Sequence, residues 1–199
     1  MRGEIDEMYE RAWYWLTDRV KTRGHARRAY FWFRRCAEQG HVPSQGQVGD
    51  MLLSGEGVRK DVKEAVRWLR LAAAAGDTDA LTTLGVCYFY GTGVRRNKRA
   101  AFEHYLKAAA TRNGSGAACW NLALCFVNGD GTDRDYVAAM QWFKKTANSD
   151  SCRTKESAML WLSRLYAEGL GVRRSPRWAR HWRSRAVAHR RMLEGFREK

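Results

Sequence analysis

A Gly-x-Gly motif recurs four times along the chain at a nearly constant spacing, and this recurrence constrains the fold more than any other feature. The motifs begin at Gly55, Gly91, Gly129 and Gly169, so successive first glycines are 36, 38 and 40 residues apart. The residues seven and three positions before each first glycine are apolar, and an alanine stands ten positions after it. A period of this length indicates a solenoid, because each short unit must bury its apolar face against its neighbours.

Each unit has the pattern of two helices joined by a turn. The first glycine lacks a Cβ and therefore suits the left-handed residue that ends a helix. Six residues later stands a side chain that can accept hydrogen bonds from the free amides of a second helix. These predicted N-cap residues are Asp61, Asn97, Asp135 and Ser175. Between Asp61 and Ala75 the apolar residues recur at helical spacing, so the second helix has one face that a neighbouring unit must cover.

The whole chain is predicted to be a single all-α domain, residues 1–199, of helix-turn-helix repeats. Four repeats carry the motif and span residues 44–76, 80–111, 117–148 and 157–193. Residues 4–40 form a divergent N-terminal capping repeat, in which Arg19 and Lys21 occupy the glycine positions. The last repeat ends in an arginine-rich capping helix, whose apolar stripe consists of Trp178, Trp182, Ala186 and Leu193. A hydrophobic share of 45% is sufficient for a packed core.

The residues that identify a family are clearest in the repeat that carries Gly91. They are Leu84-Gly85, Tyr88, Gly91-Thr92-Gly93-Val94, Ala101, Tyr105 and Lys107-Ala108-Ala109. In this order they resemble the Sel-one-like repeat (SLR), a relative of the tetratricopeptide repeat, and the likeness covers about residues 25–190. The resemblance implies a right-handed α/α superhelical solenoid that acts as an adaptor or scaffold in protein complexes, without shared catalytic residues or a cofactor. The sequence departs from the pattern at Thr132, His104 and Arg183, which replace a valine, a tryptophan and an aromatic residue.

The cysteines and histidines show no pattern of a metal or catalytic site. Four of the five cysteines align with apolar residues of other repeats and are predicted to be small buried hydrophobes: Cys36, Cys87, Cys119 and Cys125. Cys152 lies in a polar insertion and is the candidate for an exposed thiol. Closely spaced Cys or His pairs, which zinc requires, are absent from the sequence. We therefore predict a non-enzymatic protein with no catalytic, cofactor-binding or metal-binding residue.

The position of the cations is more informative than their number. The chain has 36 Lys and Arg against 21 Asp and Glu, a formal charge of +15. Basic residues follow the Gly-x-Gly motifs and continue into the last helix: Arg59, Lys60, Arg95, Arg96, Arg134, Arg173, Arg174, Arg177 and Arg180. Arginines and backbone amides at the start of a helix can bind an anion. The alternative is that these charges only solvate a loop, and the sequence leaves both interpretations open.

Two functions are compatible with this pattern. The first is a protein-interaction scaffold, which binds an acidic surface or a peptide through a groove lined by the first helix of each repeat, or through the arginine-rich edge. The alternative is a nucleic-acid-associated module or a peripheral subunit of a ribonucleoprotein, because a charge of +15 favours phosphate contacts. Against the alternative, the aromatic residues occupy core positions and no base-stacking motif is visible.

The sequence also gives an expectation for the cellular compartment. An odd number of cysteines, a charged N-terminal segment and the lack of any apolar run of about 20 residues favour a soluble, intracellular protein, in the cytoplasm or an organelle matrix. No transmembrane segment is expected, and the oligomeric state is left open.

Overall fold

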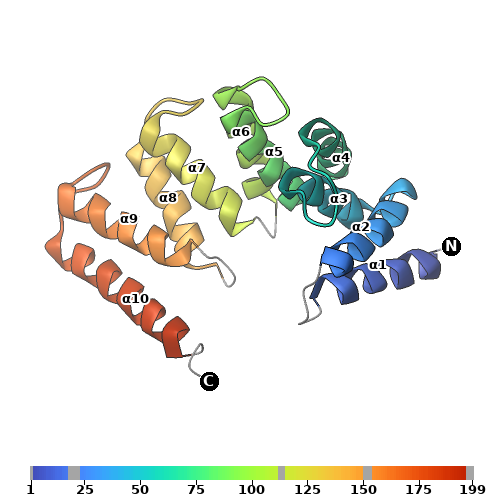
Figure 1. The fold of residues 1–199 in the computed structure, drawn as a ribbon. Coiled ribbons are helices and arrows are strands. Elements are labelled where there is room, and N and C mark those ends of the chain that lie inside the picture. The colour runs from blue at the N-terminus through green and yellow to red at the C-terminus, as the bar shows by residue number, and fades with distance from the viewer. Residues whose placement is uncertain (1, 18–22, 112–114, 150–153, 196–199) are drawn as a thin grey trace. The chain divides into compact units, whose positions relative to one another are not determined.

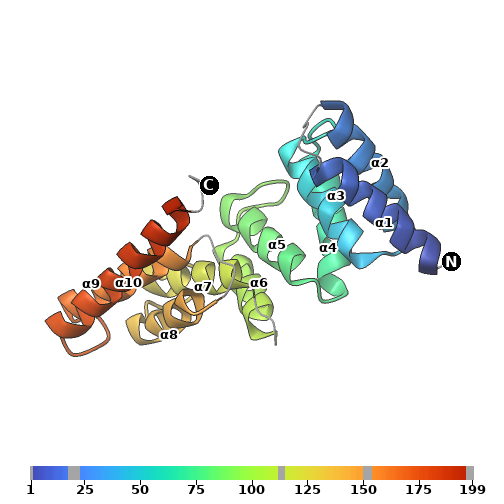
Figure 2. The same ribbon diagram turned by 90° about the horizontal axis from the view of Figure 1, so that it is seen from below.

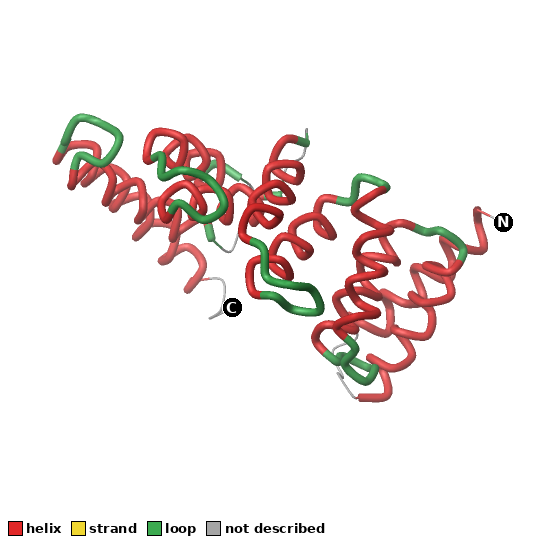
Figure 3. The backbone as a smooth tube through the Cα atoms, turned by 90° about the horizontal axis from the view of Figure 1, so that it is seen from above, coloured by secondary structure: helices red, strands yellow, loops and turns green. Residues whose placement is uncertain are grey.

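A computed structural model describes residues 2–17, 23–111, 115–149 and 154–195, and these segments contain ten α-helices. Figure 1 shows them in order: α1 (Arg2–Thr17), α2 (Arg23–Glu38), α3 (Val42–Ser54), α4 (Val62–Ala74), α5 (Thr78–Tyr90), α6 (Lys98–Ala110), α7 (Gly116–Asn128), α8 (Tyr136–Ala147), α9 (Lys155–Glu168) and α10 (Pro176–Gly195). The described segments between them are loops and contain no strand (Figure 3). The predicted all-α fold of helix-turn-helix repeats is confirmed.

The helices group into two compact units. The first unit, Met1–Asn97, contains α1 to α5, and the second, Lys98–Lys199, contains α6 to α10. Within each unit every helix lies beside the next one along the chain (Figures 1 and 2). The division falls between α5 and α6, which are the two helices of one repeat. The single domain over residues 1–199 stays a prediction.

The turn inside each repeat has the geometry that its residues predict. The first glycines have φ between 75° and 81°, and the Gly55 amide donates to the Met51 carbonyl at 2.8 Å. The loop is then closed by the N-cap amide, as in the 3.0 Å bond from Asp61 N to the Leu52 carbonyl. The side chains of Asp61 and Asp135 each accept from two amides of the following helix. The helix ends predicted at these residues are confirmed.

The second glycine of each motif has a separate role that the sequence did not suggest. Its φ lies between 67° and 77°, again in the left-handed region. It also lies against the first turn of the preceding second helix, which is α2, α4, α6 or α8. A Cβ at Gly93, for example, would overlap the carbonyl oxygen of Val62. Each loop is therefore fixed to the repeat before it by a contact that only glycine permits.

One buried cluster of the first unit includes Phe33 of α2, which is fully buried, and another includes Leu69 of α4. The Phe33 ring makes edge contacts with Trp13, at a centroid distance of 5.5 Å, and with Tyr9 at 5.9 Å. A Cβ at Gly49 would approach Leu69 Cγ to 2.6 Å, so the small residue predicted at this position does allow α3 and α4 to approach closely.

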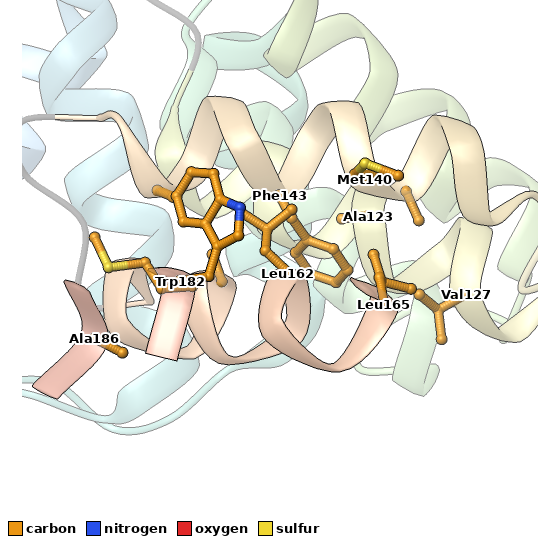
Figure 4. Packing of buried hydrophobic residues seen from close by; sticks show 12 residues of the cluster. Ala123, Val127, Met140, Phe143, Leu162, Leu165, Trp182 and Ala186 are labelled. Carbon is orange, nitrogen blue, oxygen red and sulfur yellow. The ribbon is translucent and has the colours of Figure 1, made fainter. Parts of the chain in front are cut away.

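The core of the second unit gathers residues from α7, α8, α9 and α10 around Phe143 (Figure 4). The Phe143 ring is fully buried and stacks on Trp161 of α9 at a centroid distance of 5.6 Å, with Trp120 of α7 at 5.5 Å. Trp182 and Ala186 of α10 complete the cluster and are almost fully buried.

Part of the predicted stripe on the last helix is not buried. Trp178 and Leu193 are each 48% exposed, so only Trp182 and Ala186 of the predicted four residues contribute to the core. The helical spacing predicts a stripe without predicting how much of it is buried, and Trp178, in the first turn of α10, stacks on Tyr166 at 6.1 Å instead of entering the cluster. Arg19, Lys21 and Cys152 lie outside the described residues.

Candidate functional site

In the first unit, the first helix of each repeat has one side that the core clusters around Phe33 and Leu69 do not include, and we call this side of every first helix the helix-A face. It consists of residues twelve, eight, five and one positions before the first glycine, a spacing that places them on one stripe of a helix. In the first unit the helix-A face comprises Glu7, Arg11 and Tyr14 of α1, Pro43, Gln47, Asp50 and Ser54 of α3, and Asp79, Thr83, Val86 and Tyr90 of α5. Tyr14 and Tyr90 are 63% and 72% exposed.

Charge in the first unit is separated between the two kinds of helix. The first helices, α1, α3 and α5, carry six carboxylates and two arginines, whereas α2 and α4 carry eight cations and two carboxylates. Within the described residues, neither Asp50 nor Asp79 forms an ion pair. Although the chain is strongly basic, the helix-A face of the first unit is therefore acidic.

Asp50 is the carboxylate whose ionisation this arrangement changes most. Partial burial beside α5 and the negative charges of Asp79 and Asp77 raise the pKa of its carboxyl to about 6, against the opposing effect of a hydrogen bond from Thr83. Burial and Asp77 also raise the pKa of Asp79. These carboxylates repel one another, so a cation that bound beside them would be stabilised.

The helix-A face of the second unit has a different chemistry. It comprises Ala117, Asn121, Leu124 and Asn128 of α7, and Ser157, Trp161, Arg164 and Glu168 of α9. The Arg164 guanidinium lies over the Trp161 ring at 5.1 Å and its Nε donates to Glu168 at 2.8 Å. α7 carries no charged residue, so its part of the face is apolar and amide-bearing, and Leu124 and Trp161 also pack against the core around Phe143.

The nine predicted basic residues all lie on exposed positions of the loops or of α10. Arg59, Lys60, Arg95 and Arg96 belong to two loops of the first unit, and Arg134, Arg173, Arg174, Arg177 and Arg180 belong to the second. The Cβ atoms of Lys60, Arg96, Arg134 and Arg174 lie 3.2–3.9 Å from where a Cβ of the first glycine would stand. The chain at these four residues therefore passes close to the first glycine of the motif.

Two of these residues line a cleft in the first unit together with an arginine that was not among the predicted residues. The cleft has a volume of about 600 Å³ and is lined by Arg95, Arg96, Arg70 of α4, Tyr88 and Asn97. Arg70 donates to the Tyr88 hydroxyl at 3.0 Å, and Arg96 Nε donates to the Phe89 carbonyl at 3.1 Å. The structure thus brings Arg95 and Arg96 together with a third cation.

In the second unit an ion pair fixes one Gly-x-Gly loop to the helix before it. Asp130, the middle residue of the motif, is 9% exposed and accepts from Lys98 Nζ of α6 at 2.5 Å and from Asn128 Nδ2 at 3.4 Å. This ion pair was not predictable from sequence spacing, because the two residues are 32 positions apart.

A comparison with protein families now decides the identity of the repeats. The family model of the Sel1 repeat matches residues 26–41, 42–77, 78–110, 116–151 and 156–189, which together make up most of the chain. The chain belongs to the Sel1 repeat family. The five matches include the repeat without a Gly-x-Gly motif, and they confirm the resemblance to Sel-one-like repeats.

Solved Sel1 repeat structures support the same conclusion. A protective antigen of uropathogenic Escherichia coli strains, which displays an SLR fold, is 30% identical with a TM-score of 0.84 over 94% of this chain, and the chain spans 39% of that protein. A Sel1 repeat protein from Oxalobacter formigenes is 26% identical with a TM-score of 0.79, over 93% of this chain and 73% of its own. A structure from Klebsiella pneumoniae subsp. pneumoniae, 18% identical with a TM-score of 0.61 over 94% of this chain and 88% of its own, supports the fold alone. No curated protein sequence matches the chain.

Family membership indicates the kind of role that Sel1 repeats generally have. Sel1 repeat proteins generally act as protein-interaction scaffolds, and solenoids of this family are generally non-catalytic. Nothing in these similarities supports the nucleic-acid alternative. None of the helices in the described segments is long and apolar enough to cross a bilayer.

The cysteines of this Sel1 repeat protein have the environment predicted for structural residues. Cys36, Cys87, Cys119 and Cys125 are buried and free of disulfides. Burial raises the pKa of Cys87 to about 11 and that of Cys125 to about 12, so both thiols stay protonated and unreactive near neutral pH. In the part of the chain that the structure describes, no group of three or more His, Cys, Asp or Glu residues could hold a metal ion.

Proposed function

We propose that this protein is a non-catalytic scaffold that binds a protein partner through the helix-A faces of its repeats. The observation that carries the proposal is the exposure of Tyr14 and Tyr90, at 63% and 72%, on the helix-A face of the first unit. Tyrosine is enriched in protein interfaces because its ring offers a large contact area at a small cost in conformational entropy. A scaffold needs such residues on its surface, whereas the fold itself does not.

The charge of the face supports a partner segment that carries Lys or Arg. Asp50 and Asp79 lack an ion-pair partner in the described residues, and the exposed tyrosines on the same face can receive a guanidinium through a cation–π contact. Complementary charge steers association and selects among partners. A cationic segment that crosses α3 and α5 would therefore satisfy both kinds of side chain.

The proposal is tested by affinity capture from the native source, followed by mass spectrometry, with the intact chain and a Tyr14→Ala, Tyr90→Ala variant. We expect the intact chain to retain a discrete protein in stoichiometric amount, and the variant to lose it. Truncation of exposed aromatic side chains leaves the fold intact, which circular dichroism of the variant checks.

The matched control is Phe31→Ala with Leu71→Ala, which removes two apolar side chains of α2 and α4 that are 52% and 53% exposed. These residues lie on the second helices, so the partner should be retained. Capture of no stable protein would count against a scaffold, and equal loss in both double variants would show that the helix-A face is not the binding surface.

A further inference from the structure

The arginine-lined cleft of the first unit has no negative charge of its own. Arg70, Arg95 and Arg96 line the volume of about 600 Å³ together with Tyr88 and Asn97, and no carboxylate of the described residues is among the lining side chains. A volume of this size admits the whole of a side chain or a small ligand, since ligand pockets are commonly about 300–1,000 Å³. The cleft is therefore large enough to receive a group from another molecule.

The preceding repeat shows what the cleft lacks. Arg34 stands 36 residues before Arg70 and pairs with Glu38 at 3.0 Å and with Glu64 at 3.2 Å. At the two positions 36 residues after these glutamates the chain has Ala74 and Ala100. Within the described residues, Arg70 forms no ion pair, although it occupies the position of a doubly paired arginine.

The guanidinium groups are nevertheless held in place by uncharged acceptors. Arg70 Nη2 donates to the Tyr88 hydroxyl, and Arg96 Nε donates to the Phe89 carbonyl. A guanidinium has five N–H donors, so each of the two retains donors for a ligand. The loop that carries Arg95 and Arg96 is closed by the 2.8 Å bond from Asn97 N to the Tyr88 carbonyl and is fixed to α4 by Gly93.

We infer that this cleft binds an oxyanion, a carboxylate or a phosphate, that is displayed on a peptide segment of a protein partner. Planar guanidinium groups match both anions in geometry and form charge-assisted hydrogen bonds with them. The peptide is favoured over a nucleic acid because the inference rests on the proposed scaffold function and because the cleft is a single discrete volume, not a track of cations along a backbone.

The test measures fluorescence anisotropy with three labelled probes at low ionic strength: a short Glu-rich peptide, a phosphoserine peptide and a single-stranded RNA. We expect one or both peptides to bind the intact chain, and their Kd to rise at least about tenfold in Arg70→Gln, Arg96→Gln. Preference between the two peptides assigns the carboxylate or the phosphate. Inorganic phosphate should compete if the phosphopeptide is preferred.

The matched control is Lys63→Gln with Arg67→Gln, which removes two exposed cations from the same helix as Arg70 without touching the cleft. It should change Kd less than about twofold, because neither side chain lines the cleft and an exposed charge outside a binding site contributes little. Unfolding midpoints of both double variants verify that they are folded.

Equal loss of binding in the two variants, or RNA binding tighter than either peptide, would overturn the inference. So would a failure of all three probes to bind. The proposed scaffold function would still hold if the intact chain captures a partner and the capture depends on Tyr14 and Tyr90. The scaffold function and the anion-binding cleft can therefore be refuted independently.

Discussion

At the scale of single residues, the two glycines of each motif perform different tasks. The first ends a helix, and the second allows a loop to touch the backbone of the preceding repeat. A Cβ at Gly93 would overlap the Val62 carbonyl and approach Val66 Cγ2 to 3.1 Å, whereas a Cβ at Gly76 would meet no atom within 4 Å. Both residues have positive φ, 70° and 89°. A comparison of alanine substitutions at Gly93 and Gly76 therefore separates the cost of backbone strain, which both share, from the cost of steric overlap, which only Gly93 has.

We predict that Gly93→Ala lowers the free energy of unfolding by about 3 kcal/mol or more, and Gly76→Ala by only about 1–2 kcal/mol. The smaller loss is the cost of placing alanine in the left-handed region, and the excess at Gly93 comes from displacing α4. Urea denaturation of the two variants measures the difference. Equal losses would mean that the loop moves freely away from α4.

At the scale of elements, the pairing of α3 with α5 places Asp50 beside Asp77, Asp79, Thr83 and Cys87. The pKa of Asp50 is raised from its ordinary value of 3.8 to about 6, so folding favours its protonated form. The stability that this group contributes is present in full below about pH 4, and it is lost as the pH rises through 6.

Asp50→Asn should therefore stabilise the protein at pH 8 and leave its stability unchanged at pH 4. Because Asp50 remains exposed, solvent screening limits the gain to about 1 kcal/mol or less. Chemical denaturation at the two pH values measures it, and Asp133→Asn on an exposed loop serves as the control. A gain of equal size at both pH values would assign the effect to packing.

The turn geometry of each element was predictable because capping depends on local chemistry. Glycine at the helix end and Asp61 or Asp135 at the next helix start are recognised from residue type and spacing alone. The exposure of Trp178 was not predictable in this way. Helical spacing places a side chain on an apolar stripe but does not show how far along the helix the neighbouring helices pack against that stripe. The acidic helix-A face was hidden by the net charge, which sums over both kinds of helix.

The cleft was predicted only in part. Arg95 and Arg96 were found from their place after the motif, but Arg70 was not, because it comes from a different helix. The alignment of the repeats did contain a sign of this cleft. Arg34 and Arg70 occupy equivalent positions, and the glutamates that pair with Arg34 are replaced by Ala74 and Ala100 in the next repeat. Comparing the partners of equivalent residues, and not only the residues themselves, would have identified it.

At the scale of the whole molecule, charge and packing are both distributed by unit. The first unit has 16 Lys and Arg against 12 Asp and Glu, and the second has 20 against 9, so most of the +15 charge belongs to the second. The cluster around Phe33 lies within the first unit and the cluster around Phe143 within the second. In repeat proteins stability is the sum of such local terms and of the interfaces between neighbours.

We predict that Phe143→Ala costs about 3–5 kcal/mol and that the loss is local. Amide hydrogen exchange should quicken in α7, α8 and α9, which surround Phe143, and change little in α1 to α3. Val137→Ala removes a side chain of α8 that is 51% exposed and should leave exchange unaltered. Uniform acceleration along the whole chain would show instead that the two units unfold as one.

The contact that each second glycine makes always points toward the N-terminal side of the chain. Gly57, Gly93, Gly131 and Gly171 all touch a helix that precedes them in the chain, at Ala26, Val62, Lys98 and Tyr136. During synthesis on the ribosome, every such loop emerges after the helix turn on which it docks. The protein can therefore assemble in the order in which it is made, with each new pair of helices closing on a surface that is already complete.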